Sequence, residues 1–148
     1  YRLQRVDILH DCGASLNPAL DLGQIEGGFV QGMGWLTSEE LWWDAQGRLR
    51  THAPSTYKIP AASDVPAAFN VAIYAAGRNQ EDAIYRSKAV GEPPLMLGIS
   101  VFHAIKDAIA ATGDGPLHLA APATPERVLL AVAQRRTAAA MPTAKAAE

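Results

Sequence analysis

Large apolar side chains recur along the chain at two spacings, one typical of helices and one typical of strands. Between 20 and 36 they step by three or four residues, as on one face of an α-helix; the positions are Ile25, Phe29, Met33 and Leu36. The same step recurs between 95 and 109, at Leu95, Ile99, Phe102, Ile105 and Ile109. We therefore predict two long helices. We expect the first half of the second to be buried nearly all round, because apolar residues also occupy its other faces.

Segments in which apolar and polar residues alternate flank the first helix. This alternation spans 1–9 and 69–74 and predicts a strand in each range. Residues 40–51 have the pattern of a hairpin, so Trp42 and Trp43 would point to opposite faces and one of them would lie in the core. Together the patterns predict an α+β fold in which a mixed β-sheet is packed with two long helices.

The C-terminal third of the chain contains one more helix signal and then loses its apolar pattern. Thr124 and Pro125 are typical of a helix N-cap and a first helical residue. Residues 135–148 are alanine-rich, and we predict a disordered tail there, after one domain over 1–134. Because Tyr1 opens directly into a strand pattern, we expect the chain to be a piece of a longer polypeptide.

Composition places the chain among globular proteins and excludes several classes of partner. Of its 148 residues, 49% are hydrophobic and 19% are charged, and the net charge of −2 predicts no basic surface for nucleic acid. No run of about eighteen apolar residues is present, so we expect no membrane span. The single cysteine, Cys12, excludes an internal disulfide and fits a reducing compartment. We therefore expect a cytoplasmic protein.

The first predicted helix is unusually rich in glycine, at Gly23, Gly27, Gly28, Gly32 and Gly34. Each glycine destabilises a helix interior by roughly 1 kcal/mol relative to alanine, so another interaction must compensate. Two pairs share a spacing of four residues, Gly23 with Gly27 and Gly28 with Gly32. Each pair would form a bare strip where other groups can approach the backbone closely.

Two glutamines accompany these strips. Gln24 and Gln31 lie seven residues apart, close to two helical turns, and would share one face. Side-chain amides both donate and accept hydrogen bonds and so suit a polar heterocyclic ligand. Tight helix packing with two solvated glutamines is the alternative interpretation.

Several other polar residues invite a chemical role but have simpler interpretations. His10 and Cys12 are two possible metal ligands, too few for a site. Glu39 and Glu40 are interpreted as a solvated pair, because adjacent side chains diverge. Tyr57 and Lys58 could donate to a ligand, although a structural turn is the simpler interpretation.

The stretch 87–95, Ser-Lys-Ala-Val-Gly-Glu-Pro-Pro-Leu, places Glu92 between a glycine and two prolines. Proline favours the first helical positions, so Glu92 falls at a helix start, where N–H groups and the helix dipole stabilise negative charge. Gly91 leaves space for a close approach to the backbone. A plain acidic N-cap and a general base kept ionised by the helix start are both compatible with these residues.

Three blocks in this order resemble the C-terminal molybdenum-cofactor domain of the molybdenum hydroxylases, the family of xanthine dehydrogenases and aldehyde oxidases. They are 17–32, which contains Gly-Gln-Ile-Glu-Gly-Gly-Phe-Val-Gln-Gly, then 54–60, Pro-Ser-Thr-Tyr-Lys-Ile-Pro, and 87–95. The resemblance covers roughly residues 1–134. The chain departs from the family pattern at 52–53, where His-Ala replaces the expected Arg-Gly, which leaves the local loop geometry open.

The resemblance implies roles for individual residues. Glu92 would be the general base that takes the proton from a molybdenum-bound hydroxyl. Gln24 would hydrogen-bond the molybdopterin cofactor, whose flat pterin would lie against the bare helix. Ala89, Val90 and Gly91 would lie along the pterin and the metal. No residue of this chain is expected to ligate the metal itself.

The resemblance also implies a substrate and partners. The substrate would be a purine, with hypoxanthine and xanthine oxidised to urate; an aldehyde or another N-heterocycle is the alternative within the family. A non-catalytic interaction module is the alternative outside it. Electrons would leave through [2Fe–2S] clusters to FAD and then NAD, held in other domains or a small subunit. The upstream part of the same subunit would complete the pocket. We expect the full enzyme to be oligomeric and this chain alone to be inactive.

Overall fold

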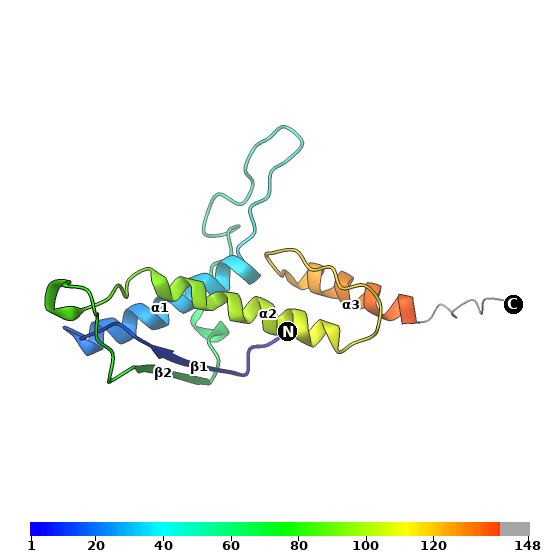
Figure 1. The fold of residues 1–148 in the computed structure, drawn as a ribbon. Helices are drawn as coiled ribbons and strands as arrows, with labels where there is room; N and C mark the ends of the chain where they lie inside the picture. Colours follow the sequence, from blue (N-terminus) through cyan, green and yellow to red (C-terminus); the bar gives the residue numbers. More distant parts are fainter. Residues whose placement is uncertain (140–148) are drawn as a thin grey trace, which may run out of the picture.

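A computed structural model describes residues 1–139 and combines a small sheet with long helices (Figure 1). The strands and helices follow in the order β1 (Arg5–His10), α1 (Pro18–Thr37), β2 (Ala68–Ile73), α2 (Ile99–Ala110) and α3 (Pro125–Ala139). Short 3₁₀ segments lie at Ala62–Asp64, at Ile84–Arg86 and at Pro93–Gly98, the last of which is named η3. The predicted combination of a sheet with long helices is confirmed.

The sheet is smaller than expected and runs in one direction. Within the described residues, β1 pairs only with β2, in parallel, from Arg5 opposite Ala68 to His10 opposite Ile73. Parallel neighbours need a crossover connection, and here the long segment that contains α1 supplies it. The expected mixed sheet is thus a two-stranded parallel one.

Helix α1 forms where the apolar spacing predicted it. The Asn17 side chain accepts a hydrogen bond from Leu20 N at 3.3 Å, and Pro18 occupies the first helical position. Its inward face and that of α2 meet in the core beside the sheet. The buried members of this core are Ile8, Ile25, Phe29, Met33, Val101, Ile105, Ile109, Ala123 and Ala131.

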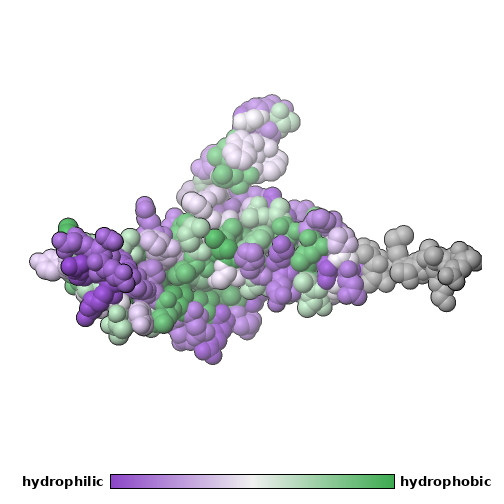
Figure 2. All heavy atoms as spheres, viewed as in Figure 1, coloured by the Kyte–Doolittle hydropathy of each residue, from purple (hydrophilic) through white to green (hydrophobic). Residues whose placement is uncertain are grey.

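The second predicted helix differs from expectation in its first half. It begins as the 3₁₀ segment η3 and becomes α-helical only at Ile99. Met96 is 59% exposed and Ile99 is 39% exposed, so the prediction of burial all round was wrong. The reason is that α1 covers one side of η3 only. Figure 2 shows apolar side chains, in green, on the surface in the region of α2.

The predicted hairpin is present but stands away from the body. Residues 41–58, named the arm, project from the end of α1 (Figure 1). Trp43 bridges Leu49, and Arg50 N donates to the Trp42 carbonyl at 2.8 Å. Trp42 and Trp43 are both about half exposed, so the prediction that one of them lies in the core was wrong. The tip of the arm lies away from the helices and the sheet of the described chain (Figure 1).

Helix α3 starts as predicted. Thr124 Oγ1 accepts a hydrogen bond from Arg127 N at 3.4 Å, and Pro125 is the first helical residue. None of the described helices is both long enough and apolar enough to cross a membrane.

The end of α3 lies beyond the predicted start of the tail. The helix continues to Ala139 rather than ending at 134. The Arg135 guanidinium donates to backbone carbonyls of Ala110, Gly113 and Gly115, where α2 ends. Residues 135–139 are therefore helical, and Arg135 ties this part of α3 to the end of α2. The rest of the predicted tail, residues 140–148, lies outside the described part of the chain.

Candidate cofactor site

One of the two glycine strips on α1 is filled by the chain itself. A side-chain carbon on Gly28 would lie 2.9 Å from Pro94 Cβ, and one on Gly32 would overlap the carbonyl group of Leu95. Pro94 is buried in this contact. The strip lets η3 pack directly on the α1 backbone, and this packing compensates for part of the low helix propensity.

The other strip is open. A side-chain carbon on Gly23 or Gly27 would meet no atom within 4 Å. At Gly28 and Gly32 the interpretation of tight packing is therefore confirmed, because η3 fills this strip and leaves no face there for a flat ligand. The ligand face is not tested by the contacts of the other strip. It stays a prediction for Gly23 and Gly27.

The open strip lies beside the stretch that contains Glu92. Gln24, between the two open glycines, has its side-chain Oε1 3.7 Å from the position of a carbon built on Gly91. Gln24, Gly91 and Glu92 are all exposed to solvent in this chain. The fold thus brings the first and third sequence blocks together, although they are far apart in the sequence.

A cavity of about 800 Å³ opens at this junction. Its lining contains four predicted site residues, Ala89, Val90, Gly91 and Glu92. Gln24 is not part of the lining and reaches this edge of the site through its proximity to Gly91. Gln31, predicted to share the Gln24 face, does line the cavity.

Trp35 and Met96 also line this cavity and were not identified from the sequence. Trp35 follows Gln31 by four residues on α1, and this helical spacing was the signal that could have identified it. Both side chains are more than half exposed in the described chain.

Glu92 holds the N-cap position of η3 without capping it through its side chain. Its backbone is already helical, with φ −105° and ψ −39°, and its carboxylate makes no cap hydrogen bond. The Glu92 carbonyl accepts from Leu95 N at 3.0 Å instead. The interpretation as a plain acidic cap is therefore wrong, because the Glu92 carboxylate makes no hydrogen bond to the start of η3.

The acidic pair at the base of the arm is structural. Glu39 is 8% exposed and accepts a 2.5 Å hydrogen bond from the Tyr57 hydroxyl. Glu40 accepts from Arg127 at 2.8 Å. The interpretation as a solvated pair was wrong because both carboxylates have partners from distant segments. The Glu39 carboxylate, together with desolvation, raises the pKa of Tyr57.

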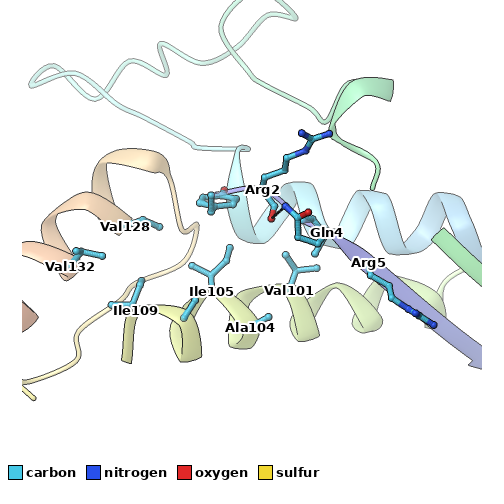
Figure 3. Close-up of a pocket in the computed structure, with 12 residues that line it drawn as sticks. Arg2, Gln4, Arg5, Val101, Ala104, Ile105, Ile109, Val128 and Val132 are labelled. Carbon is cyan, nitrogen blue, oxygen red and sulfur yellow. Dashed lines mark hydrogen bonds between the residues drawn. The ribbon is translucent and has the colours of Figure 1, made fainter. Parts of the chain in front are cut away.

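An apolar cavity lies away from these residues. It measures about 530 Å³ and is lined by residues 1–5, by α2 and by Val128 and Val132 of α3 (Figure 3). Within residues 1–139, no group of three or more His, Cys, Asp or Glu side chains could hold a metal ion. The chemistry-bearing residues that the fold gathers are therefore those around Gln24 and Glu92.

Comparisons with known proteins point to one family. Residues 1–66 match the family described as molybdopterin cofactor-binding domain. The chain is 54% identical over 129 residues to xanthine dehydrogenase/oxidase of Gallus gallus, covering 84% of this chain and 9% of that protein. It is 46% identical over 138 residues to aldehyde oxidase 1 of Macaca fascicularis, covering 90% of this chain and 10% of that protein.

A solved structure agrees with these relatives. The crystal structure of quinoline 2-oxidoreductase from Pseudomonas putida 86 matches with a TM-score of 0.79 and 29% identity, over 90% of this chain and 16% of that one. The chain spans about a tenth of the length of the curated relatives it matches. Fold and sequence therefore agree with the resemblance carried by the three blocks, and the chain belongs to the molybdenum hydroxylase family of enzymes.

Proposed function

We propose that this chain supplies one wall of the cofactor pocket in a xanthine dehydrogenase-type hydroxylase, with Glu92 as the general base. The observation that carries the proposal is the junction of Gln24 with Gly91 at the edge of the cavity that contains Glu92. In the complete protein the substrate would be a purine, with hypoxanthine and xanthine oxidised to urate. Residues 1–134 would form the cofactor-binding domain.

The open part of the site fits a molybdopterin. A flat pterin needs a face free of side chains, and Gly23 and Gly27 leave such a face on α1. Its ring nitrogens and oxygens need donors and acceptors, which the exposed amide of Gln24 offers. This wall offers no His, Cys, Asp or Glu cluster as metal ligands, so the metal would be held through the cofactor and other parts of the protein.

Each residue then has a separate task. Gln24 hydrogen-bonds the pterin and fixes its orientation. Gly91, with Ala89 and Val90, presents backbone rather than bulky side chains along the cofactor. Glu92 takes the proton from the hydroxyl nucleophile as that oxygen attacks the electron-poor carbon of the substrate, which is the task of a general base.

The bound molybdenum group supplies a two-electron oxidation of the substrate carbon, whose new oxygen comes from water. The two electrons would leave through [2Fe–2S] clusters and FAD to NAD. We place these groups in other domains or a small partner subunit, and the remaining pocket residues in the upstream part of the same subunit. A cytoplasmic location and an oligomeric full enzyme complete the proposal.

A second candidate substrate class is an aldehyde or another N-heterocycle. The 46% identity to aldehyde oxidase 1 and the fold match to quinoline 2-oxidoreductase favour keeping it beside the purine. Assaying the complete protein with xanthine, an aromatic aldehyde and quinoline separates the classes, since the preferred one has the highest kcat/KM.

The test of the proposed base is Glu92→Gln in the full-length protein, with Glu81→Gln as the matched control at an exposed loop carboxylate. A general base contributes roughly 10²- to 10⁴-fold to a rate, so we expect turnover to fall by at least that lower factor in Glu92→Gln. Molybdenum content, measured by elemental analysis, should match the parent in both variants. Retained turnover in Glu92→Gln would refute the role.

A further inference from the structure

We propose that Asp11 is a positioning residue for the site: its ion pair with Lys88 holds the segment 89–92 so that Glu92 stays in register with Gln24. The inference rests on the proposed function of Glu92 and adds two residues to it. Asp11 is the first residue after β1, and Lys88 directly precedes Ala89. The pair therefore couples the end of the sheet to the start of the site segment.

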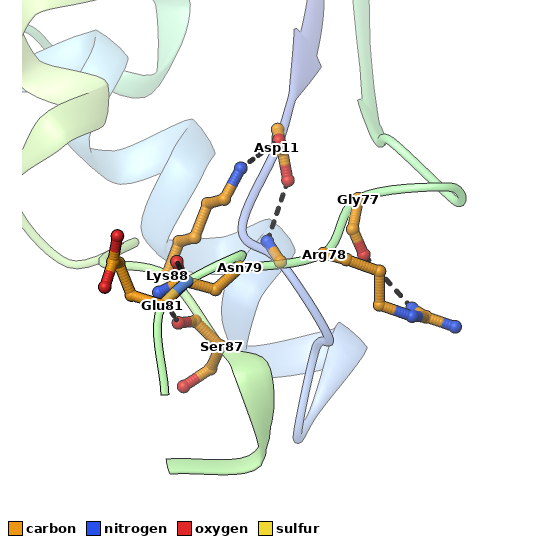
Figure 4. A network of polar contacts seen from close by, with 8 residues as sticks. Asp11, Gly77, Arg78, Asn79, Glu81, Ser87 and Lys88 are labelled. Atoms are coloured by element: carbon orange, nitrogen blue, oxygen red, sulfur yellow. Dashed lines mark hydrogen bonds and ion pairs between the residues drawn. The ribbon is translucent and has the colours of Figure 1, made fainter. Parts of the chain in front are cut away.

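The contact is direct and has several parts (Figure 4). Lys88 Nζ lies 2.5 Å from Asp11 Oδ2, and the other carboxylate oxygen accepts from Gly13 N at 2.9 Å. The Lys88 backbone N–H donates to the Cys12 carbonyl at 2.8 Å. Lys88 is thus held at both its backbone and its side chain by residues 11–13.

Two glycines make room for this arrangement. Gly13 has a positive φ of +66°, and a side-chain carbon on it would lie 2.9 Å from Lys88 N. A side-chain carbon on Gly77 would overlap the Asp11 carboxylate. Backbone therefore closes around Asp11 from two segments. Both side chains stay partly exposed, at 36% for Lys88 and 38% for Asp11. What distinguishes the pair from an ordinary surface ion pair between two flexible side chains is therefore the additional backbone contacts.

The turn that precedes Lys88 has a strained backbone conformation, and hydrogen bonds from neighbouring segments hold it in place. Tyr85 and Arg86 have φ of 51° and 60°, a left-handed region that residues other than glycine rarely adopt. The Arg86 carbonyl accepts from Ala14 N at 3.0 Å and from Asn79 N at 3.1 Å. Asn79 Nδ2 donates to Ser87 O at 3.0 Å (Figure 4). Such a conformation persists only where its surroundings determine it.

The opposite end of the site segment is also fixed. Pro94 is buried against Gly28, so the chain is anchored just after Glu92. Segment 89–93 therefore spans two anchors, Lys88 and Pro94. Releasing the first would let Glu92 move relative to Gln24, and a misplacement of about 1 Å is enough to lower a rate by roughly 10²-fold.

The charges required for the pair are present at neutral pH. The hydrogen bond from Lys88, and next the one from Gly13 N–H, hold the pKa of Asp11 below its ordinary value. The carboxylate is therefore ionised where the enzyme would work.

The experiment uses the full-length protein and four variants: Asp11→Ala, Lys88→Met, Lys88→Arg, which keeps the charge, and Asp7→Asn as control. The control removes the exposed ion pair on β1 in which Arg5 Nε lies 2.6 Å from Asp7 Oδ2. We expect kcat to fall roughly 10- to 100-fold in Asp11→Ala and in Lys88→Met, with KM and molybdenum content within about twofold of the parent. The control should keep its kcat.

Parental kcat in both Asp11→Ala and Lys88→Met overturns the proposal. It is also overturned if kcat falls only in proportion to molybdenum content or folded protein, because the pair would then be merely structural. Lys88→Arg, which keeps the charge, should fold and retain most of kcat; equal loss there and in Lys88→Met also counts against the proposal. Glu92→Gln assayed in parallel distinguishes the two failures: retained turnover there refutes the general base, whereas loss of turnover there with parental kcat in Asp11→Ala and Lys88→Met refutes only the positioning role.

Discussion

The side-chain oxygen of Gln24 lies 3.7 Å from the position that a carbon on Gly91 would occupy. This distance is an ordinary van der Waals contact, so the amide on α1 and the backbone beside Glu92 are neighbours with no side chain between them. The relationship makes the open face of α1 and the segment 89–92 parts of one wall.

Bulk at position 91 should therefore interfere with the cofactor and leave the fold intact. We expect Gly91→Val to lower the molybdenum content of the full-length protein, because its extra carbons would enter the space between Gln24 and the cofactor. Gly91→Ala is the matched control, since its single carbon would only contact Gln24 Oε1. Elemental analysis measures the effect, and equal metal content in both variants would contradict it.

Removing the Gln24 side-chain amide should also lower the molybdenum content, through lost hydrogen bonds rather than through added bulk. Gln24→Ala would delete the proposed hydrogen bonds to the pterin, whose loss costs about 0.5–1.5 kcal/mol each, and so should weaken cofactor retention about 2- to 10-fold. Retention is measured as molybdenum remaining after dialysis. Gln4→Ala, at an exposed position in the N-terminal segment, is the control. Loss of metal from both variants alike would argue against a specific contact.

The two glycine strips should respond in opposite directions to alanine. Gly27→Ala adds a carbon in open space on a helix and should stabilise α1 by about 1 kcal/mol. Gly32→Ala forces a carbon into the Leu95 carbonyl and should destabilise the same helix, because backbone on both sides would have to shift. Hydrogen exchange of α1 amides in the full-length protein reports both changes. Equal protection in the two variants would contradict the packing described.

The glycine strips also show where sequence reasoning reached its limit. The periodicity of Ile25, Phe29 and Met33 places the helix and its buried face, because that information is local. Gly23/Gly27 and Gly28/Gly32 have identical spacing, and only the tertiary contact with η3 tells the filled strip from the open one. The local sequence pattern does not indicate which distant segment packs against each strip.

The same limit explains the exposed aromatic and apolar residues. Trp42, Trp43 and Met96 are large apolar residues, and the sequence alone assigned one of the two tryptophans and Met96 to burial. In the described chain they face solvent because this wall of the site and the arm have no covering segment from residues 1–139. Glu92 was placed correctly at a helix start, yet its free carboxylate depends on backbone angles that residue types do not specify.

At the base of the arm, the Tyr57 hydroxyl donates a hydrogen bond to the Glu39 carboxylate, and this contact should depend on pH. The carboxylate accepts from the neutral hydroxyl and repels the phenolate, which raises the pKa of Tyr57 above its ordinary value of 10.0. A group whose pKa is raised in the folded state contributes its full stabilisation below the unfolded pKa, and that stabilisation is lost as pH rises through the folded pKa. The contact should therefore hold across neutral pH and weaken only above about pH 10.

Ultraviolet titration of the phenolate tests this directly, as the difference between the parent and Tyr57→Phe in the same full-length background. We expect a midpoint above pH 10 for the missing group. In Glu39→Gln the same difference should move back toward the ordinary value, because the amide still accepts a hydrogen bond but carries no charge to repel the phenolate. A midpoint at or below 10 in the parent, or no movement in Glu39→Gln, would mean that the carboxylate does not control this tyrosine.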